Sequence, residues 1–192
     1  MAERPRYRVE HGRWCIDITV RRARQLFDSR DPSPFRERDL DEQAVEYLIG
    51  SAREIPGSRP LAIVVTLTEP LEPPLTTDVL VEAVHAHFTY QLEQVNRQLQ
   101  AHWRRGRGFL AVGLTVLAIF LTLAEVAETM LAAGALRDIL REGLVITGWV
   151  AMWRPLEVLI YDWRPLVDER RQVQRLLDAT VLVRESTDPA QA

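Results

Sequence analysis

The histidines and the single cysteine are the residues that could bind a metal ion or attack a substrate, and their spacing argues against both roles. His85 and His87 are two residues apart in a predicted helix, so their side chains point in different directions. Cys15 alternates with Trp14 and Ile16 in a predicted strand, and no neighbouring base would activate its thiol. We therefore expect a buried structural thiol, no metal or cofactor site, and no enzyme activity.

A dense pattern of charges occupies residues 28–41, which two prolines mark as a loop. All 24 basic residues of the chain are arginine, and arginine binds carboxylates in fixed, bidentate pairs. The pattern therefore favours ion pairs that hold an ordered loop against the helix that follows. The alternative is a docking site for a partner or an anionic ligand. The candidate docking residues are Asp28, Arg30, Asp31, Phe35, Arg36 and Arg38.

The tetrapeptide Trp-Arg-Pro-Leu occurs at residues 153–156 and again at 163–166. Ten helical residues cover about 15 Å, half of a bilayer core, so the two copies cannot share a membrane surface in one straight helix. In one interpretation each copy is an interfacial elbow, where arginine reaches phosphate and proline restarts the helix. In the other, a kinked helix buries Arg154 beside Glu157. The candidate residues are Trp153, Arg154, Pro155, Glu157, Trp163, Arg164 and Pro165.

Two apolar segments must position these groups. Residues 108–124 are 17 consecutive uncharged residues, about 26 Å of helix, which is within reach of a bilayer core. We predict that residues 125–142 are an external connection and that residues 143–161 cross again, with a proline kink or an interfacial elbow. Arginine is abundant before the first crossing and after the second, which predicts that both termini are cytoplasmic. The positive-inside anchor is formed by Arg104, Arg105 and Arg107.

The remaining elements predict a small cytoplasmic α+β domain with about three strands, at residues 14–20, 61–68 and 180–184. Asp39 is the predicted N-cap of a helix that ends near Glu54, with Glu42 as its capping-box partner. A stripe of apolar residues follows at steps of three and four in a long helix, and we expect it to make contacts between chains. The stripe comprises Leu80, Val84, Phe88, Leu92, Val95 and Leu99.

The predicted fold class is an α+β membrane protein, in which a transmembrane hairpin of two helices continues into cytoplasmic helices and a small α+β domain. The cytoplasmic domain occupies residues 14–75, and a long helix at residues 76–107 leads into the membrane. A helix and a strand return at residues 165–184. Residues 1–13 are a predicted flexible N-terminus and residues 185–192 a predicted disordered tail.

Two motifs carry a resemblance to a known family. They are LFDSRDPSPFRERDLD at residues 26–41 and WRPLEVLIYDW at residues 153–163. Together with the two apolar segments, they resemble a family of uncharacterised bacterial inner-membrane proteins with two crossings. The resemblance covers most of the chain after Trp14, and it implies the topology but no activity.

These patterns predict a multi-pass protein of the bacterial inner membrane. With a net charge of -3, the chain is not basic enough overall to suggest a nucleic-acid partner. We expect a non-enzymatic oligomeric scaffold or accessory subunit, whose partners are the lipid bilayer, further copies of the chain and an unknown protein at the cytoplasmic domain. The alternative is an oligomeric ion channel or transporter that uses Arg154 and Glu157 in the membrane region.

Overall fold

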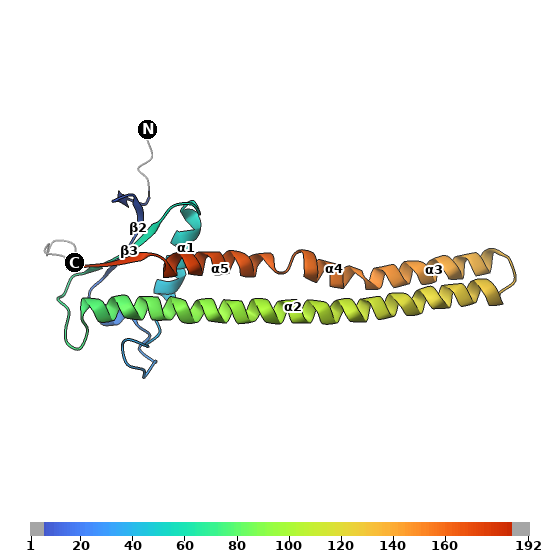
Figure 1. The fold of residues 1–192 in the computed structure, drawn as a ribbon, viewed down its shortest axis with the longest axis horizontal. Coiled ribbons are helices and arrows are strands. Elements are labelled where there is room, and N and C mark those ends of the chain that lie inside the picture. The colour runs from blue at the N-terminus through green and yellow to red at the C-terminus, as the bar shows by residue number, and fades with distance from the viewer. Residues whose placement is uncertain (1–5, 186–192) are drawn as a thin grey trace, which may run out of the picture. The chain divides into compact units, whose positions relative to one another are not determined.

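The computed structural model describes residues 6–185, which form a mixed α+β chain with a four-stranded sheet and two long apolar helical stretches (Figure 1). The chain divides into two compact units. Unit 1 contains residues 6–95 and 169–185, and unit 2 is Asn96–Asp168. Residues 1–5 and 186–192, which include part of the predicted flexible terminus and most of the predicted tail, lie outside the described residues.

The sheet of unit 1 has the strand order β1-β2-β3-β4. The three predicted strands are β2 (Arg13–Val20), β3 (Leu61–Leu67) and β4 (Thr180–Glu185), and they pair in parallel. The expectation that the last strand joins the other two is therefore confirmed. Two of the strands, β2 and β3, carry alternating or continuous apolar residues, which suits a sheet that is covered by helices.

Strand β1 (Val9–Glu10) was not predicted, because its residues fall in the segment expected to be flexible. It pairs antiparallel with β2 through a turn at His11 and Gly12. Both turn residues have positive φ angles, 49° and 78°. This combination fits the tight hairpin turns that match the twist of the flanking strands. The prediction of a flexible segment is wrong for these residues, since the His-Gly pair is a weaker hairpin signal than Asn-Gly or Asp-Gly.

One face of the sheet and the helices of unit 1 enclose the main core. The core includes Ile16 and Ile63 from the sheet, Phe88 from α2 (Thr77–Met130) and Leu176 from α5 (Arg164–Leu177), all buried. The apolar stripe of α2 therefore packs within its own chain. The expectation that this stripe makes contacts between chains is wrong for its buried members, which are Leu80, Val84, Phe88 and Val95.

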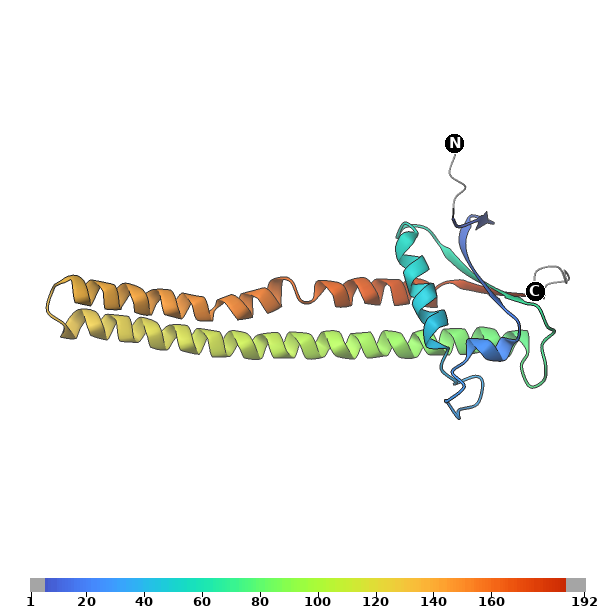
Figure 2. The ribbon, with the colours of Figure 1, turned by 180° about the vertical axis from the view of Figure 1, so that it is seen from behind.

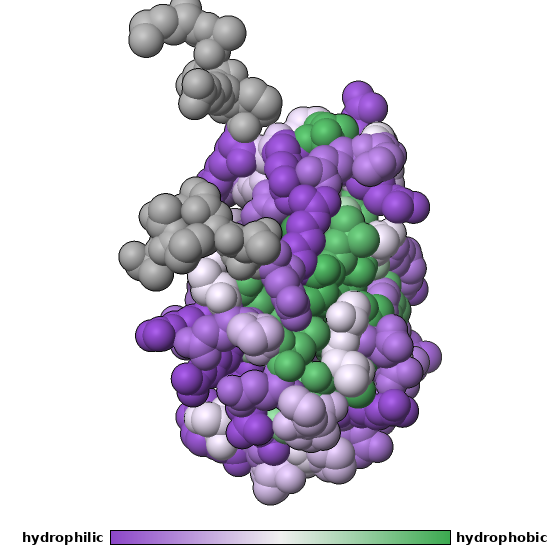
Figure 3. Space-filling view, turned by 90° about the vertical axis from the view of Figure 1, so that its left-hand side faces the viewer, coloured by the Kyte–Doolittle hydropathy of each residue, from purple (hydrophilic) through white to green (hydrophobic). Residues whose placement is uncertain are grey.

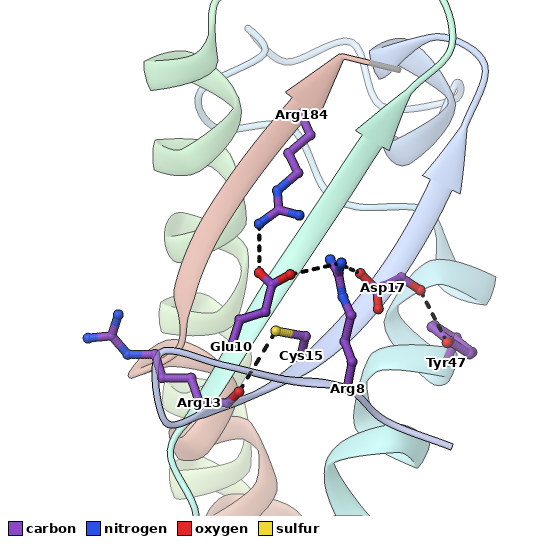
Figure 4. Close-up of polar contacts among 7 residues, drawn as sticks. All are labelled: Arg8, Glu10, Arg13, Cys15, Asp17, Tyr47 and Arg184. Atoms are coloured by element: carbon purple, nitrogen blue, oxygen red, sulfur yellow. Dashed lines mark hydrogen bonds and ion pairs between the residues drawn. The ribbon is translucent and has the colours of Figure 1, made fainter. Parts of the chain in front are cut away.

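The other face of the sheet carries a small second core under charged side chains. Cys15, Ala62 and Val64 are buried there, which agrees with the prediction of a buried thiol. Arg8 pairs with Glu10 at 2.9 Å and with Asp17 at 2.7 Å, and a third ion pair joins Glu10 to Arg184 of β4 at 2.6 Å (Figure 4). Figure 3 views unit 1 from the left-hand side of Figure 1 and shows apolar surface between polar side chains.

Helix α1 (Glu42–Glu54) begins two residues later than predicted. Its N-cap is Asp41, whose carboxylate accepts hydrogen bonds from the backbone N–H groups of Gln43 and Ala44. Asp39 is not the cap, because Leu40 forms a β-bridge with Phe27 and keeps the chain extended up to that point. The 3₁₀ helix η1 (Ala23–Leu26) precedes this bridge and places Leu26 and Phe27 in the core.

Unit 2 consists of the second half of α2, helix α3 (Ala135–Ala151), helix α4 (Trp153–Ile160) and the start of α5. The connection predicted at residues 125–142 is helical apart from one short turn. Helix α2 continues to Met130, and only residues 131–134 separate it from α3. Glu125 and Glu128 are good helix formers, so their charge does not end the helix. Figures 1 and 2 show the interruptions between α3 and α4 and between α4 and α5.

Candidate functional site

Each copy of the repeated tetrapeptide lies at the start of a helix. Trp153 is the first residue of α4 and Pro155 its third, whereas Arg164 and Pro165 are the first two residues of α5. Proline is tolerated in the first turn of a helix, because the N–H groups of that turn have no partner within the helix. The structure therefore has the helix restarts that were expected of the elbow interpretation.

Arg154 and Glu157 form an ion pair within α4, with 2.9 Å between Arg154 Nη1 and Glu157 Oε2. This is the pair that their spacing predicts. Both side chains lie on the surface of the chain, with 66% and 44% of their side-chain areas exposed. The structure therefore shows the helix restart of the elbow interpretation together with the Arg154–Glu157 contact of the kinked-helix interpretation, with both charged side chains on the surface of the chain.

Three glycines let the helices of unit 2 approach closely. A Cβ atom on Gly113 of α2 would lie 2.8 Å from Pro155, and one on Gly106 would lie 3.0 Å from the side chain of Leu159. On α3, the corresponding atom of Gly148 would lie 3.1 Å from Leu117. These contacts were not predicted from the sequence. The available signal was the spacing of Gly106 and Gly113, which are seven residues apart and therefore share one helix face.

A belt of aromatic and basic residues surrounds the second tetrapeptide. The rings of Trp103 and Trp163 stack with 6.5 Å between their centroids, and His102 Nε2 lies 3.2 Å from the carbonyl oxygen of Val158. These contacts bring Arg104 and Arg105, which follow Trp103, close to the level of Arg164, whereas Arg107 lies nearer the level of Leu159, which packs against Gly106. The exposed arginines of this belt are Arg104, Arg105, Arg107 and Arg164.

The loop at residues 28–41 in unit 1 is ordered by its own polar groups. The Asp31 carboxylate accepts hydrogen bonds from the backbone N–H groups of Ser33 and Asp39, which lowers its pKa to about 2. The Arg30 guanidinium forms a bidentate contact with Asp28, and this contact lowers the pKa of Asp28. Among the described residues, the contact between Arg30 and Asp28 is a bidentate pair of the kind predicted for this loop.

Aromatic and interelement contacts fix the rest of this loop. The Arg38 guanidinium lies 4.5 Å from the ring centroid of Phe35, and Phe35 packs edge-on against Phe27 with 5.4 Å between centroids. Arg36 pairs with Glu82 of α2 at 3.3 Å. The candidate docking residues therefore make contacts inside unit 1, as expected of a loop that is held in place. The side chains of Arg30 and Arg36 nevertheless remain largely exposed.

His87 joins the loop to α2, a contact that sequence analysis missed. Its Nδ1 atom lies 3.1 Å from Asp39 Oδ1 and 3.3 Å from the backbone nitrogen of Leu40. The side chain is buried, and its Nε2 atom has no hydrogen-bond partner among residues 6–185. Burial lowers the pKa of His87, and the Asp39 carboxylate opposes that shift. A cavity of about 370 Å³ beside His87 is lined mostly by polar residues, including Asp28, Arg30 and Gln91.

Among residues 6–185, no group of three or more histidine, cysteine and acidic side chains could hold a metal ion. Two helical stretches, Thr77–Met130 and Ala135–Leu177, each contain a segment long and apolar enough to cross a membrane. No family model, curated protein or solved structure matches the chain, so the family resemblance rests on its two motifs alone.

Proposed function

We propose that the chain is an integral membrane protein of a bacterial inner membrane, whose unit 2 crosses the bilayer twice as a helical hairpin. The observation that carries this proposal is apolar surface without a protein cover. Only 11% of the most apolar segment of α2 is buried within the chain, and 22% of the corresponding segment after Ala135. Val112, Ile146 and Val150 are 64%, 62% and 66% exposed. Soluble proteins rarely expose contiguous apolar surface on this scale, whereas lipid would cover it.

The arginines support a cytoplasmic location for unit 1 and both termini. Arg104, Arg105 and Arg107 precede the uncharged residues 108–124, and Arg164 begins the helix that leaves the second crossing. Stacking of Trp103 on Trp163 brings Arg104 and Arg105 close to the level of Arg164. Clusters of arginine next to apolar helices favour the cytoplasmic side, and tryptophan favours the headgroup region.

Contacts within unit 2 support a location for the Arg154–Glu157 pair near the cytoplasmic edge of the apolar layer. Pro155 lies against Gly113, and Leu159 lies against Gly106. Gly113 is five residues into the uncharged run, which is about 7.5 Å along the helix axis. Arg154, one residue deeper than Pro155, therefore lies about 9 Å inside the layer, and Glu157 lies closer to its edge. A mutually paired arginine and carboxylate at this depth avoids much of the free-energy cost of an unpaired charge in hydrocarbon.

We infer that the protein acts as a non-enzymatic oligomeric scaffold or accessory subunit, with unit 1 as a docking domain for another protein. The order of the 28–41 loop supports this role, because a fixed loop with exposed guanidinium groups offers a preorganised surface to a partner. The alternative, an oligomeric channel or transporter, receives its support from the exposed charges of Arg154 and Glu157. Because Arg154 and Glu157 pair with each other within one helix, neither charge is available to line a path for ions or substrates. This pairing favours the scaffold.

Four measurements test this proposal. After cell lysis, the full-length chain should sediment with membranes and resist extraction at alkaline pH. Recovery in the aqueous phase would exclude the membrane assignment.

Reporter tags at each end should give cytoplasmic signals, and a periplasmic signal would reverse the orientation. Cross-linking in native membranes should capture a reproducible protein partner through unit 1, whereas ion flux into liposomes that contain only this chain would favour the channel.

A further inference from the structure

Helix α4 carries a shallow groove on one face of unit 2. Its volume is about 230 Å³, and most of its lining residues are aliphatic or aromatic. They recur at steps of three and four, so they share one side of the helix. The lining residues are Trp153, Leu156, Glu157, Ile160 and Tyr161. Glu157 is the only acidic residue of this lining, and its charge is paired with Arg154 at 2.9 Å. The groove is therefore apolar along most of its length and has no uncompensated negative charge.

Basic groups lie at one end of this groove. The Arg164 guanidinium lies over the ring of Tyr161, 5.9 Å from its centroid, and within residues 6–185 it has no carboxylate partner. Arg104 and Arg105 lie close to the same level, because they follow Trp103, which stacks on Trp163. Residues 103–107 and 153–165 together contain five arginines and two acidic residues, a net charge of +3. The acidic residues are Glu157 and Asp162.

We propose that this groove binds one anionic phospholipid, with an acyl chain along α4 and the phosphate on Arg164. The proposal rests on the proposed membrane location. The groove runs from Tyr161, at the arginine end, toward Trp153, which lies deeper in the apolar layer. A phospholipid has a matching arrangement, with an anionic phosphate at the membrane surface and an apolar acyl chain below it. Tyr161 then lies at headgroup level, where its polar tip is favourable.

A second copy of the chain fits this face less well. Two copies in one membrane are related by an axis along the membrane normal, so equivalent residues meet at the same depth. Arg164 of one copy would then approach Arg164 of the other, and like charges would repel each other. A lipid phosphate at that depth supplies the opposite charge instead.

Quenching of tryptophan fluorescence by brominated lipids tests the proposal on the full-length chain. The protein is placed in phosphatidylcholine vesicles that contain an equal, small mole fraction of either brominated phosphatidylglycerol or brominated phosphatidylcholine. The signal of Trp153 is the difference between the natural chain and Trp153→Phe. We expect brominated phosphatidylglycerol to associate about fivefold more strongly at Trp153, as one arginine near an anionic lipid would provide.

Matched variants separate the two parts of the site. Arg164→Gln should remove most of the preference for phosphatidylglycerol, whereas Arg137→Gln, which is distant in the sequence and near α3's start, should not. Leu156→Gln should reduce quenching of Trp153 by both lipids, whereas Val112→Gln, an equally polar change at another exposed position, should leave it unchanged. Inorganic phosphate at the same charge concentration should not compete, because it has no acyl chain.

Three results would overturn the proposal. The first is equal quenching of Trp153 by both lipids in the natural chain, which would leave membrane insertion standing but remove the specific site. The second is a preference for phosphatidylglycerol that Arg164→Gln leaves intact, or quenching of Trp153 that Leu156→Gln leaves unchanged. The third is rapid disulfide formation between copies of an Ile160→Cys variant together with absent quenching, which would assign the groove to a second copy. Absence of the chain from membranes would instead remove the proposed function.

Discussion

Gly113 of α2 faces Pro155 of α4 so closely that a Cβ atom on Gly113 would lie 2.8 Å from Pro155 Cγ. The same atom would lie 3.1 Å from Met152 Sδ and 3.5 Å from the carbonyl oxygen of Ala151. Pro155 has no N–H group to donate to that carbonyl, so the backbone at Ala151 is free to turn toward α2. A glycine at this position therefore permits the proline-containing segment to pack against α2.

Gly113→Ala should weaken the packing of unit 2. The added methyl group would force Pro155 or Met152 to move, and overpacking of this kind destabilises by about 1–3 kcal/mol. Gly108→Ala is the matched control, because nothing lies within 4 Å of its Cβ position and alanine is the better helix former. Thermal unfolding of the detergent-solubilised chain should give a lower Tm for Gly113→Ala only. Equal Tm values for the two variants would contradict this packing.

Arg175 provides the C-terminal cap of α1, although it belongs to α5. Its guanidinium donates hydrogen bonds to the carbonyl oxygens of Ala52 at 2.6 Å, Ile55 at 3.1 Å and Pro56 at 3.1 Å. A cation at a helix C-terminus also interacts favourably with the helix dipole. Arg175→Ala should lower the free energy of unfolding by about 2–3 kcal/mol, since hydrogen bonds to charged groups contribute about 1.5–3 kcal/mol.

Arg170→Ala is the control for Arg175, because Arg170 is an exposed arginine of the same helix. Its effect should stay within about 0.5 kcal/mol. Hydrogen exchange adds a local measurement: the amides in the last turn of α1 should exchange faster in Arg175→Ala than in the natural chain. If α1 kept its protection in that variant, the cap would be dispensable.

Protonation of His87 should destabilise unit 1. Burial lowers the pKa of this side chain in the folded state, whereas the unfolded state keeps a pKa of about 6.5. The unfolded state therefore takes up a proton first as the pH falls. The contribution of neutral His87 to stability is complete above pH 6.5 and declines below it. We expect the Tm to fall between pH 7 and pH 5, and His87→Gln to flatten that decline.

The Asp39→Asn variant provides a second test of the role of His87. Asp39 Oδ1 lies 3.1 Å from His87 Nδ1, and its charge raises the pKa of His87 against the effect of burial. Removing the charge should lower that pKa further and make the loss of stability below pH 6.5 steeper. The other three histidines are unchanged in each variant, so differences between variants isolate His87. Parallel pH profiles for all three chains would refute the role of this contact.

Asp31 should order the 28–41 loop through its charge. Its pKa is lowered to about 2, first by the backbone N–H of Asp39 and then by that of Ser33. Because the folded pKa is below the unfolded value, this contribution is present above pH 4 and is lost as the pH falls through about 2. At neutral pH, Asp31→Ala should accelerate hydrogen exchange at those two amides. The control Glu37→Ala, at an exposed carboxylate of the same loop, should leave both rates unchanged.

Local patterns in the sequence predicted most of the elements of this fold. The alternation of Trp14, Ile16 and Ile18 identified β2, and the continuous apolar run from Leu61 identified the central strand. The spacing of Arg154 and Glu157 predicted their contact, because residues three apart in a helix are neighbours. Each of these signals lies within one turn or one strand, where spacing alone fixes which side chains can meet.

Contacts between distant segments could not be predicted in the same way. His87 meets Asp39 across 48 residues and Arg175 meets Ala52 across 123 residues, so neither contact leaves a periodic signal. The cap of α1 moved from Asp39 to Asp41 because a β-bridge at Leu40, formed with Phe27, delays the helix. At the start of α1, a tertiary contact therefore determined which of two neighbouring aspartates caps the helix, and local sequence signals could not show this.

The depth of the Arg154–Glu157 pair should determine how strongly the two charges are coupled. Exposed ion pairs of this kind on helices in water contribute about 0.3–0.5 kcal/mol, and a lower dielectric strengthens the attraction. In a double-mutant cycle of Arg154→Ala and Glu157→Ala in lipid nanodiscs, we expect a coupling energy above about 1 kcal/mol. The same cycle on Arg141 and Glu128, which pair at 2.6 Å near the opposite end of unit 2, should give a smaller coupling. Additive effects at residues 154 and 157 would place that pair in water and argue for elbows that lie at the membrane surface.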